Sequence, residues 1–143
     1  MPLIQVTAQE GLLAQSDQDA LMSRLSNAVL KSERASPSDP AAQALVWAYY
    51  RAMPERSVYV GGKNLADSPL HIAVTTPEGA LDDARRKTLV EEIGSIVDDT
   101  VGVFDGRLNH WAMLYELDEG SWAGGGQIFL GADIQAAMNI PAA

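Results

Sequence analysis

A repeated strand–helix–strand pattern is the feature of this 143-residue sequence that most restricts its fold. Alternating apolar residues predict strands at 2–8 and within 70–81, where a turn follows the strand. An offset of 68 positions aligns residues of like kind in these two segments: Ile4 with Ile72, Val6 with Val74, Thr7 with Thr75, Glu10-Gly11 with Glu78-Gly79, and Leu13 with Leu81. The paired glycines at 61–62 and 125–126 correspond at an offset of 64. We therefore expect one domain, 1–143, built from two repeats, about 2–62 and 70–129; chance matching is the alternative.

Each repeat contains apolar residues at helical spacing between its strands. A helix is predicted at 16–33, where Ser16 and Asp19 fit a capping box, and a second helix at 82–102. The apolar stripes of the two helices are Leu21, Leu25, Ala28 and Val29, and Leu89, Ile93, Ile96 and Val97. The remaining predictions are a loop at 34–42, strands at 43–50 and 110–117, a short strand at 55–62, and a glycine-rich hairpin at 121–129.

These elements predict an α+β fold. Two β-α-β units with right-handed crossovers form a four-stranded mixed sheet with both helices on one face. Strands 43–50 and 110–117 carry large apolar residues on both sides, which is typical of strands buried on two faces. Because the sequence offers no third layer of helices, we expect self-association to cover the second face.

Composition excludes several function classes. The net charge is −9, which disfavours nucleic acid as a partner. The chain has no cysteine and only two histidines, His71 and His110, so we expect no metal site and no cofactor. It has no apolar run of membrane-spanning length and no secretory signal at its start, so we expect a cytoplasmic protein that does not bind membranes.

Pro2 permits two interpretations. Proline is tolerated at the first residue of a strand, which makes it a structural residue. If Met1 is removed, however, Pro2 becomes a secondary amine whose lone pair can carry a proton. With Met1 attached, its nitrogen is a planar amide without a usable lone pair.

The starting proline, the repeat and the late aromatic–glycine turn together resemble the tautomerase superfamily. That superfamily includes 4-oxalocrotonate tautomerase, macrophage migration inhibitory factor and cis-3-chloroacrylic acid dehalogenase. The segments "PLIQVTAQEG" and "WAMLYELDEGSWAGGG" carry the resemblance, with Trp122 and the paired glycines at the matching spacing. The likeness to the long, fused members implies a homotrimer with Pro2 as the catalytic residue, acting on a small keto or enol acid.

The resemblance also implies positions at which this chain departs from the family. The tautomerase arginines fall on Leu12 and on Trp111 or Val46, and the dehalogenase arginines fall near Thr76 or Pro77 and on Ala80. The dehalogenase histidine falls near Val29. Guanidinium groups grip carboxylates in two places. A less charged or unusually bound substrate is therefore expected.

Five further residues are candidates for substrate binding. Arg51 and Arg56 bracket a turn and either reach the site or are solvated. Trp111 and Tyr115 share one side of a strand and line either a pocket or an interface, and Trp122 lines a pocket or packs at a subunit contact. The leading hypothesis is a tautomerase-like isomerase. The alternatives are a catalytically silent binding module, or a lyase or dehalogenase in which Tyr115 or Glu116 activates water.

Overall fold

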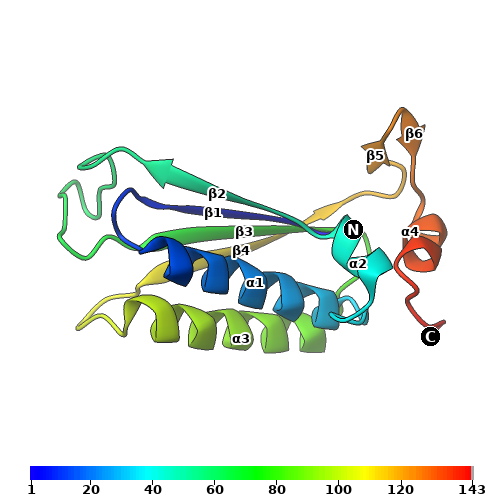
Figure 1. Ribbon diagram of the computed structural model, residues 1–143, viewed down its shortest axis with the longest axis horizontal. Helices are drawn as coiled ribbons and strands as arrows, with labels where there is room; N and C mark the ends of the chain where they lie inside the picture. The colour runs from blue at the N-terminus through cyan, green and yellow to red at the C-terminus, as the bar shows by residue number, and fades with distance from the viewer. Residues whose placement is uncertain (143) are drawn as a thin grey trace.

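The computed structural model describes residues 1–142, and a mixed four-stranded sheet forms its centre. Strand β1 (Leu3–Gln9) is parallel to β2 (Trp47–Met53), and β3 (Leu70–Pro77) is parallel to β4 (His110–Leu117). The strand order is β2-β1-β3-β4. Helices α1 (Gln15–Ser32) and α3 (Asp83–Val101) lie side by side under one face of the sheet (Figure 1). The predicted α+β fold class, with both crossover helices on one face, is confirmed.

The two central strands pair about matched positions. In the antiparallel pair β1–β3, Ile4 lies opposite Val74, Gln5 opposite Ala73, and Val6 opposite Ile72. Gln5 and Ala73 are themselves counterparts at the offset of 68. The pairing is thus centred on equivalent residues, as expected for two copies related by a local two-fold rotation.

The core lies between the sheet and the two helices. Ile4, Val6, Ile72 and Val74 point toward the helices and are buried, and Tyr50 packs against the edge of this cluster. All the residues of the two predicted helical stripes are buried in the same cluster. Burial of one stripe on each helix fixes both helices against the sheet, so this face needs no further cover.

The start of α1 differs from the prediction. The helix begins at Gln15, and Ala14 is its N-cap residue without a side-chain hydrogen bond. The Gln15 amide donates to the Asp19 carboxylate at 2.8 Å, one turn along the helix. Because the helix starts before Ser16, this serine lies inside the first turn and not at the N-cap, so the predicted Ser16–Asp19 capping box does not form.

The predicted loop at 34–42 and strand at 43–50 are also corrected. Helix α2 spans Pro40–Leu45, and β2 begins only at Trp47. The Asp39 carboxylate accepts a hydrogen bond from the Ala41 backbone N–H at 2.9 Å, and Pro40 occupies the first helical turn. An Asp-Pro pair is a common helix start, so the signal was present in the sequence.

The predicted short strand at 55–62 is wrong, since this segment turns and makes only an isolated pairing of Val60 with Lys63. The hairpin at 121–129 is confirmed as β5 (Ala123–Gly124) and β6 (Gln127–Ile128). Its turn residues Gly125 and Gly126 have φ of 57° and 80°, values that favour glycine. A further short helix, α4 (Gly131–Ala137), was not predicted.

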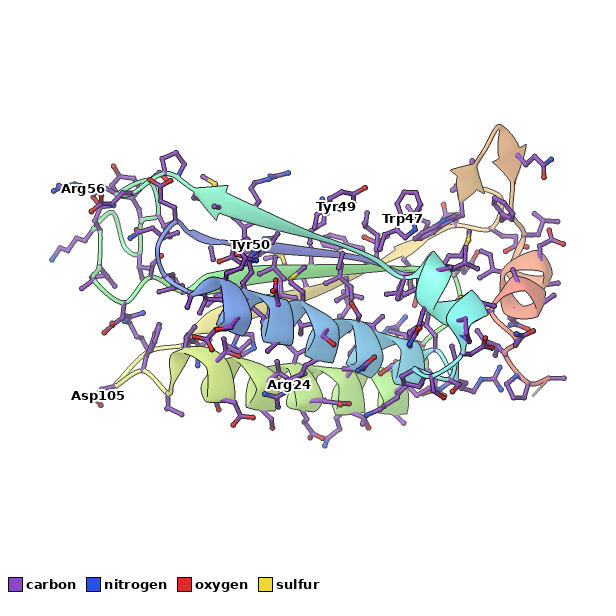
Figure 2. The ribbon with its side chains drawn as sticks, in the orientation of Figure 1. Arg24, Trp47, Tyr49, Tyr50, Arg56 and Asp105 are labelled. Carbon is purple, nitrogen blue, oxygen red and sulfur yellow. The ribbon has the colours of Figure 1, made fainter. Side chains whose placement is uncertain are left out.

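The outer face of the sheet is open. Trp47 and Tyr49 on β2 are exposed there (Figure 2). Trp111, Met113 and Tyr115 on β4 are also exposed, Trp111 to 62%. The expected burial of these strands on both sides therefore does not occur within one chain. No helix of residues 1–142 has the length and apolarity to cross a membrane.

Candidate active site

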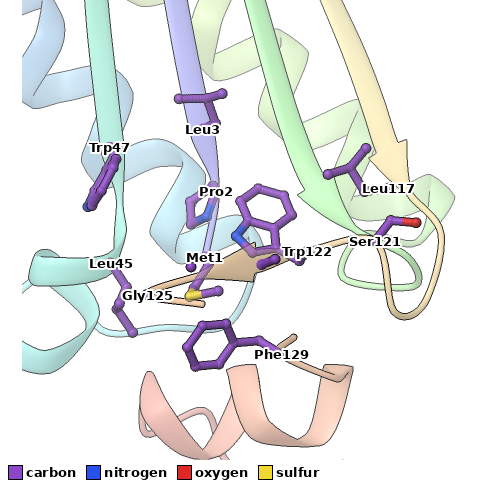
Figure 3. Close-up of a pocket in the computed structure, with 12 residues that line it drawn as sticks. Met1, Pro2, Leu3, Leu45, Trp47, Leu117, Ser121, Trp122, Gly125 and Phe129 are labelled. Carbon is purple, nitrogen blue, oxygen red and sulfur yellow. The ribbon is translucent and has the colours of Figure 1, made fainter. Parts of the chain in front are cut away.

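An apolar cavity of about 520 Å³ lies at the end of the sheet where β1 begins (Figure 3). Pro2 and Leu3 form one wall, and Trp122 faces Pro2 from the β5–β6 hairpin. Met1, which precedes Pro2, also lines the cavity. The other lining residues come from the end of α2, β2, the end of β4 and the hairpin: Leu45, Trp47, Leu117, Ser121, Ala123, Gly124, Gly125 and Phe129. A cavity of this size and apolar character suits a small organic molecule.

Three segments that are distant in sequence meet at this cavity because of backbone pairing. The Pro2 carbonyl accepts a hydrogen bond from the Trp47 backbone N–H at 3.2 Å, which joins the start of β1 to β2. The Phe129 N–H donates to the Trp122 carbonyl at 2.9 Å, which closes the hairpin. Pro2 needs no backbone donor at this position, so a proline at the strand start is compatible with the sheet.

Met1 lines the cavity and is buried, with 7% of its surface exposed. Its ammonium nitrogen lies 3.4 Å from a Glu33 carboxylate oxygen and 2.7 Å from Met138 Sδ. Burial lowers the pKa of this amine, and Glu33 opposes that change. The Pro2 nitrogen is an amide in this form of the chain. It marks the position of the secondary amine that removal of Met1 would create.

The structure brings together two of the predicted site residues, Pro2 and Trp122. Arg51 lies on the open sheet face, beside Tyr49 and His71 at a separate small cavity. Arg56 lies in the turn after β2, at the opposite end of the sheet from Pro2 (Figure 2). Within one chain, neither arginine lines the Pro2 cavity.

The remaining candidates lie on β4. Trp111 and Tyr115 face outward from the open sheet face, and the Tyr115 hydroxyl donates to Met113 Sδ at 3.2 Å. Glu116 has the opposite orientation and pairs with Arg86 of α3. Among residues 1–142, no charged side chain lines the Pro2 cavity, and Ser121 contributes its one hydroxyl.

Several lining residues were not singled out as site residues from the sequence. Leu45 and Phe129 belong to elements whose positions depend on the unpredicted helices α2 and α4. Trp47 belongs to the predicted strand at 43–50, which was expected to be buried on two faces, and it lines the cavity. Glu33 carried no sequence signal beyond its place at the end of a helix.

Comparison with known proteins gives relatives by structure alone. No protein-family model and no curated protein matches the chain. Q0, a fused 4-OT solved as a symmetric trimer, superposes with a TM-score of 0.72 at 21% identity, over 94% of this chain and 98% of its own. N1, a member of the cis-3-chloroacrylic acid dehalogenase family, gives 0.74 at 15% identity, over 94% and 89%. The chain has the tautomerase fold.

A third match has the same fold. A macrophage migration inhibitory factor-like protein from Entamoeba histolytica has a TM-score of 0.65 at 13% identity, over 90% of this chain and 98% of its own. The predicted resemblance to the tautomerase superfamily is therefore confirmed at the level of the fold. In this fold, Pro2 lies immediately before β1 and borders the apolar cavity.

Proposed function

We propose that this protein is a tautomerase-like isomerase that acts on a small keto or enol acid. After removal of Met1, the Pro2 nitrogen takes a proton from carbon beside a carbonyl group and returns it elsewhere. The observation that carries the proposal is that Pro2 lines an apolar cavity of about 520 Å³. Proton transfer of this kind involves no net oxidation or reduction, so the reaction needs no redox cofactor.

The surroundings of Pro2 favour a neutral amine. An ordinary α-amino group titrates near ~8, so it is mostly protonated at neutral pH. An apolar environment disfavours the ammonium form and lowers the pKa. Trp122, Leu45 and Phe129 supply such an environment, and burial already lowers the pKa of the Met1 amine beside them. A base whose pKa is close to the working pH can both accept and return a proton.

The proposal includes a homotrimer formed through the open sheet face. The exposed Trp111, Met113 and Tyr115 form part of an apolar surface that a monomer leaves uncovered. The solved structure of Q0 is a symmetric trimer with this fold. In such an assembly, Arg51, Arg56, Trp111 and Tyr115 are the residues we propose to reach substrate from a neighbouring copy.

Replacing Trp111 with Asp is expected to convert the trimer to monomer, because assembly would have to desolvate three carboxylates in place of three apolar side chains. Sedimentation velocity measures the change: three chain masses for the wild type and one for Trp111→Asp. Val103→Asp, an exposed apolar residue in the loop after α3, is the matched control and should remain trimeric. A monomeric wild type, or a trimeric Trp111→Asp variant, would contradict this assembly.

The activity is tested with phenylenolpyruvate and 2-hydroxymuconate as keto–enol substrates. The chain that begins at Pro2 should catalyse ketonisation. The chain that retains Met1, prepared by blocking methionine excision and verified by intact mass, should be inactive, because its Pro2 nitrogen is an amide. Equal rates for the two forms would exclude Pro2 as the proton carrier.

A catalytically silent binding module is the second candidate. It is favoured by the lack of any charged side chain around the cavity in the described part of one chain. A lyase or dehalogenase-type reaction needs a group that activates water. Glu116 pairs with Arg86 on the helix side of the sheet, which disfavours it for that role. Absence of turnover with enol and haloacrylate substrates by the chain beginning at Pro2 would support the silent module.

A further inference from the structure

The side chain of Glu33 is unusual for a carboxylate at the end of a helix. Glu33 follows the last residue of α1, and its backbone N–H donates to the Val29 carbonyl. Only 3% of its surface is exposed. Its Oε1 atom has no hydrogen-bond partner among the described residues. Burying a carboxylate whose oxygen has no hydrogen-bond partner costs free energy of folding. Such a group is therefore normally paired with a cation or a hydrogen-bond donor.

The partner in this form of the chain is the Met1 ammonium, whose nitrogen lies 3.4 Å from Oε2. Burial raises the pKa of Glu33, and the nearby ammonium opposes that rise. Arg34 and Glu78 border the same small cavity as Glu33. Arg34 forms no ion pair with Glu33 in residues 1–142, and the amino terminus is the charged group that opposes the rise in the Glu33 pKa.

Removal of Met1, on which the proposed function rests, takes that partner away. The nitrogens of adjacent residues are about 3.7 Å apart at most. The Pro2 nitrogen therefore lies within about 7 Å of Glu33 Oε2, given the 3.4 Å contact of Met1. The space between them, now filled by Met1, borders Met138 and Ile134. One water molecule bridges two polar atoms up to about 5.6 Å apart, and two water molecules in series span the full distance of about 7 Å.

We propose that Glu33 is a positioning residue for the mature amino terminus: it binds the Pro2 amine, directly or through one or two water molecules, and holds the amine in its proton-carrying orientation. A carboxylate at this distance stabilises the ammonium form, whereas the apolar cavity stabilises the neutral form. The two influences oppose each other. Their balance keeps Pro2 basic enough to take a proton from carbon and acidic enough to return it.

The proposal is tested by titrating the Pro2 nitrogen in ¹⁵N-labelled protein that begins at Pro2. Glu33→Gln keeps the size of the side chain and removes its charge, so the Pro2 midpoint should fall by about one pH unit or more. Glu33→Asp retains the charge and should stay within about half a unit of wild type. Glu78→Gln, which borders the same small cavity, is the matched control and should not move the midpoint.

Two further readouts separate positioning from a structural role. The acid limb of the pH–rate profile should shift to lower pH in Glu33→Gln, in parallel with the Pro2 midpoint. In the wild type, the ¹³C signal of the Glu33 carboxyl carbon should show an inflection at the Pro2 midpoint, because interacting groups titrate together. This second measurement needs no variant and decides the question if Glu33→Gln does not fold.

An unchanged Pro2 midpoint in folded Glu33→Gln would overturn the proposal, as would a Glu33 carbon signal that does not respond at the Pro2 midpoint. Either result would leave the proposed isomerase intact. Full activity in a chain that retains Met1 would instead overturn the isomerase mechanism, whatever the titrations show.

Discussion

Replacing Pro2 with Ala is expected to lower kcat/KM for ketonisation by about 100-fold or more. Alanine also permits removal of Met1, so the variant still presents an amine at the start of β1. That amine lacks the ring that fixes the direction of its lone pair and fills the space beside Trp122. The loss therefore measures orientation of the base rather than its mere presence.

The control for this experiment is Gln9→Ala, at the far end of the same strand. It should retain activity within about twofold, because surface substitutions away from the site change little. Initial rates at saturating and limiting enol concentrations separate kcat from KM. If Pro2→Ala keeps wild-type kcat/KM while intact mass verifies removal of Met1, the proline ring does not orient the base, and that part of the mechanism is contradicted.

Replacing Ile72 with Ala is expected to lower the free energy of unfolding by about 2–5 kcal/mol. Ile72 is fully buried on the central strand β3, where it packs between the sheet and the two helices. The substitution removes apolar contacts and leaves a cavity that neighbouring strands cannot fill. Urea denaturation at one fixed protein concentration gives the change, since association also contributes to apparent stability.

Val103→Ala provides the comparison, because Val103 is 80% exposed in the loop after α3. This variant should lie within about 0.5 kcal/mol of wild type. A loss of less than about 1 kcal/mol in Ile72→Ala would mean that the sheet–helix interface is not the principal core.

The main fold could be predicted because its signals are local and repeated. Period-two strands at 2–8 and 70–77 and helical stripes such as Leu89 and Ile93 follow from side-chain spacing alone. The hairpin at 121–129 followed from its glycines. Helix α2 was missed because the proline and serine content of 34–42 outweighed the Asp39-Pro40 start signal.

The site was harder to predict because it depends on contacts between distant parts of the chain. A glutamate at the end of a helix is normally solvated. Glu33 is buried beside Met1, which lies 32 positions earlier in the sequence and itself contacts Met138, 137 positions from Met1. The position of Trp47 also depends on a distant contact. Trp47 lines the cavity because β2 pairs with β1, and no local sequence pattern indicates this.

The positions of the arginines illustrate the same limit. Strand β2 reaches the cavity through its first residue, Trp47. Arg51 lies further along β2, and Arg56 lies beyond the end of the strand (Figure 2). A strand rises about 3.3 Å per residue. Four residues along β2 from Trp47 thus carry Arg51 about 13 Å from that end of the strand. Only contacts between copies of the chain would bring such residues to a Pro2 site.

The central claim is that Pro2, once freed of Met1, is an amine whose apolar surroundings leave it substantially neutral near physiological pH. A ¹⁵N titration of Pro2 in the chain lacking Met1, with intact mass as the check on processing, measures this directly. The account predicts a midpoint at or below about 7, which is lower than the ordinary α-amine value of about 8. A midpoint of about 8 or higher, or recovery of the natural protein with Met1 still attached, would contradict it.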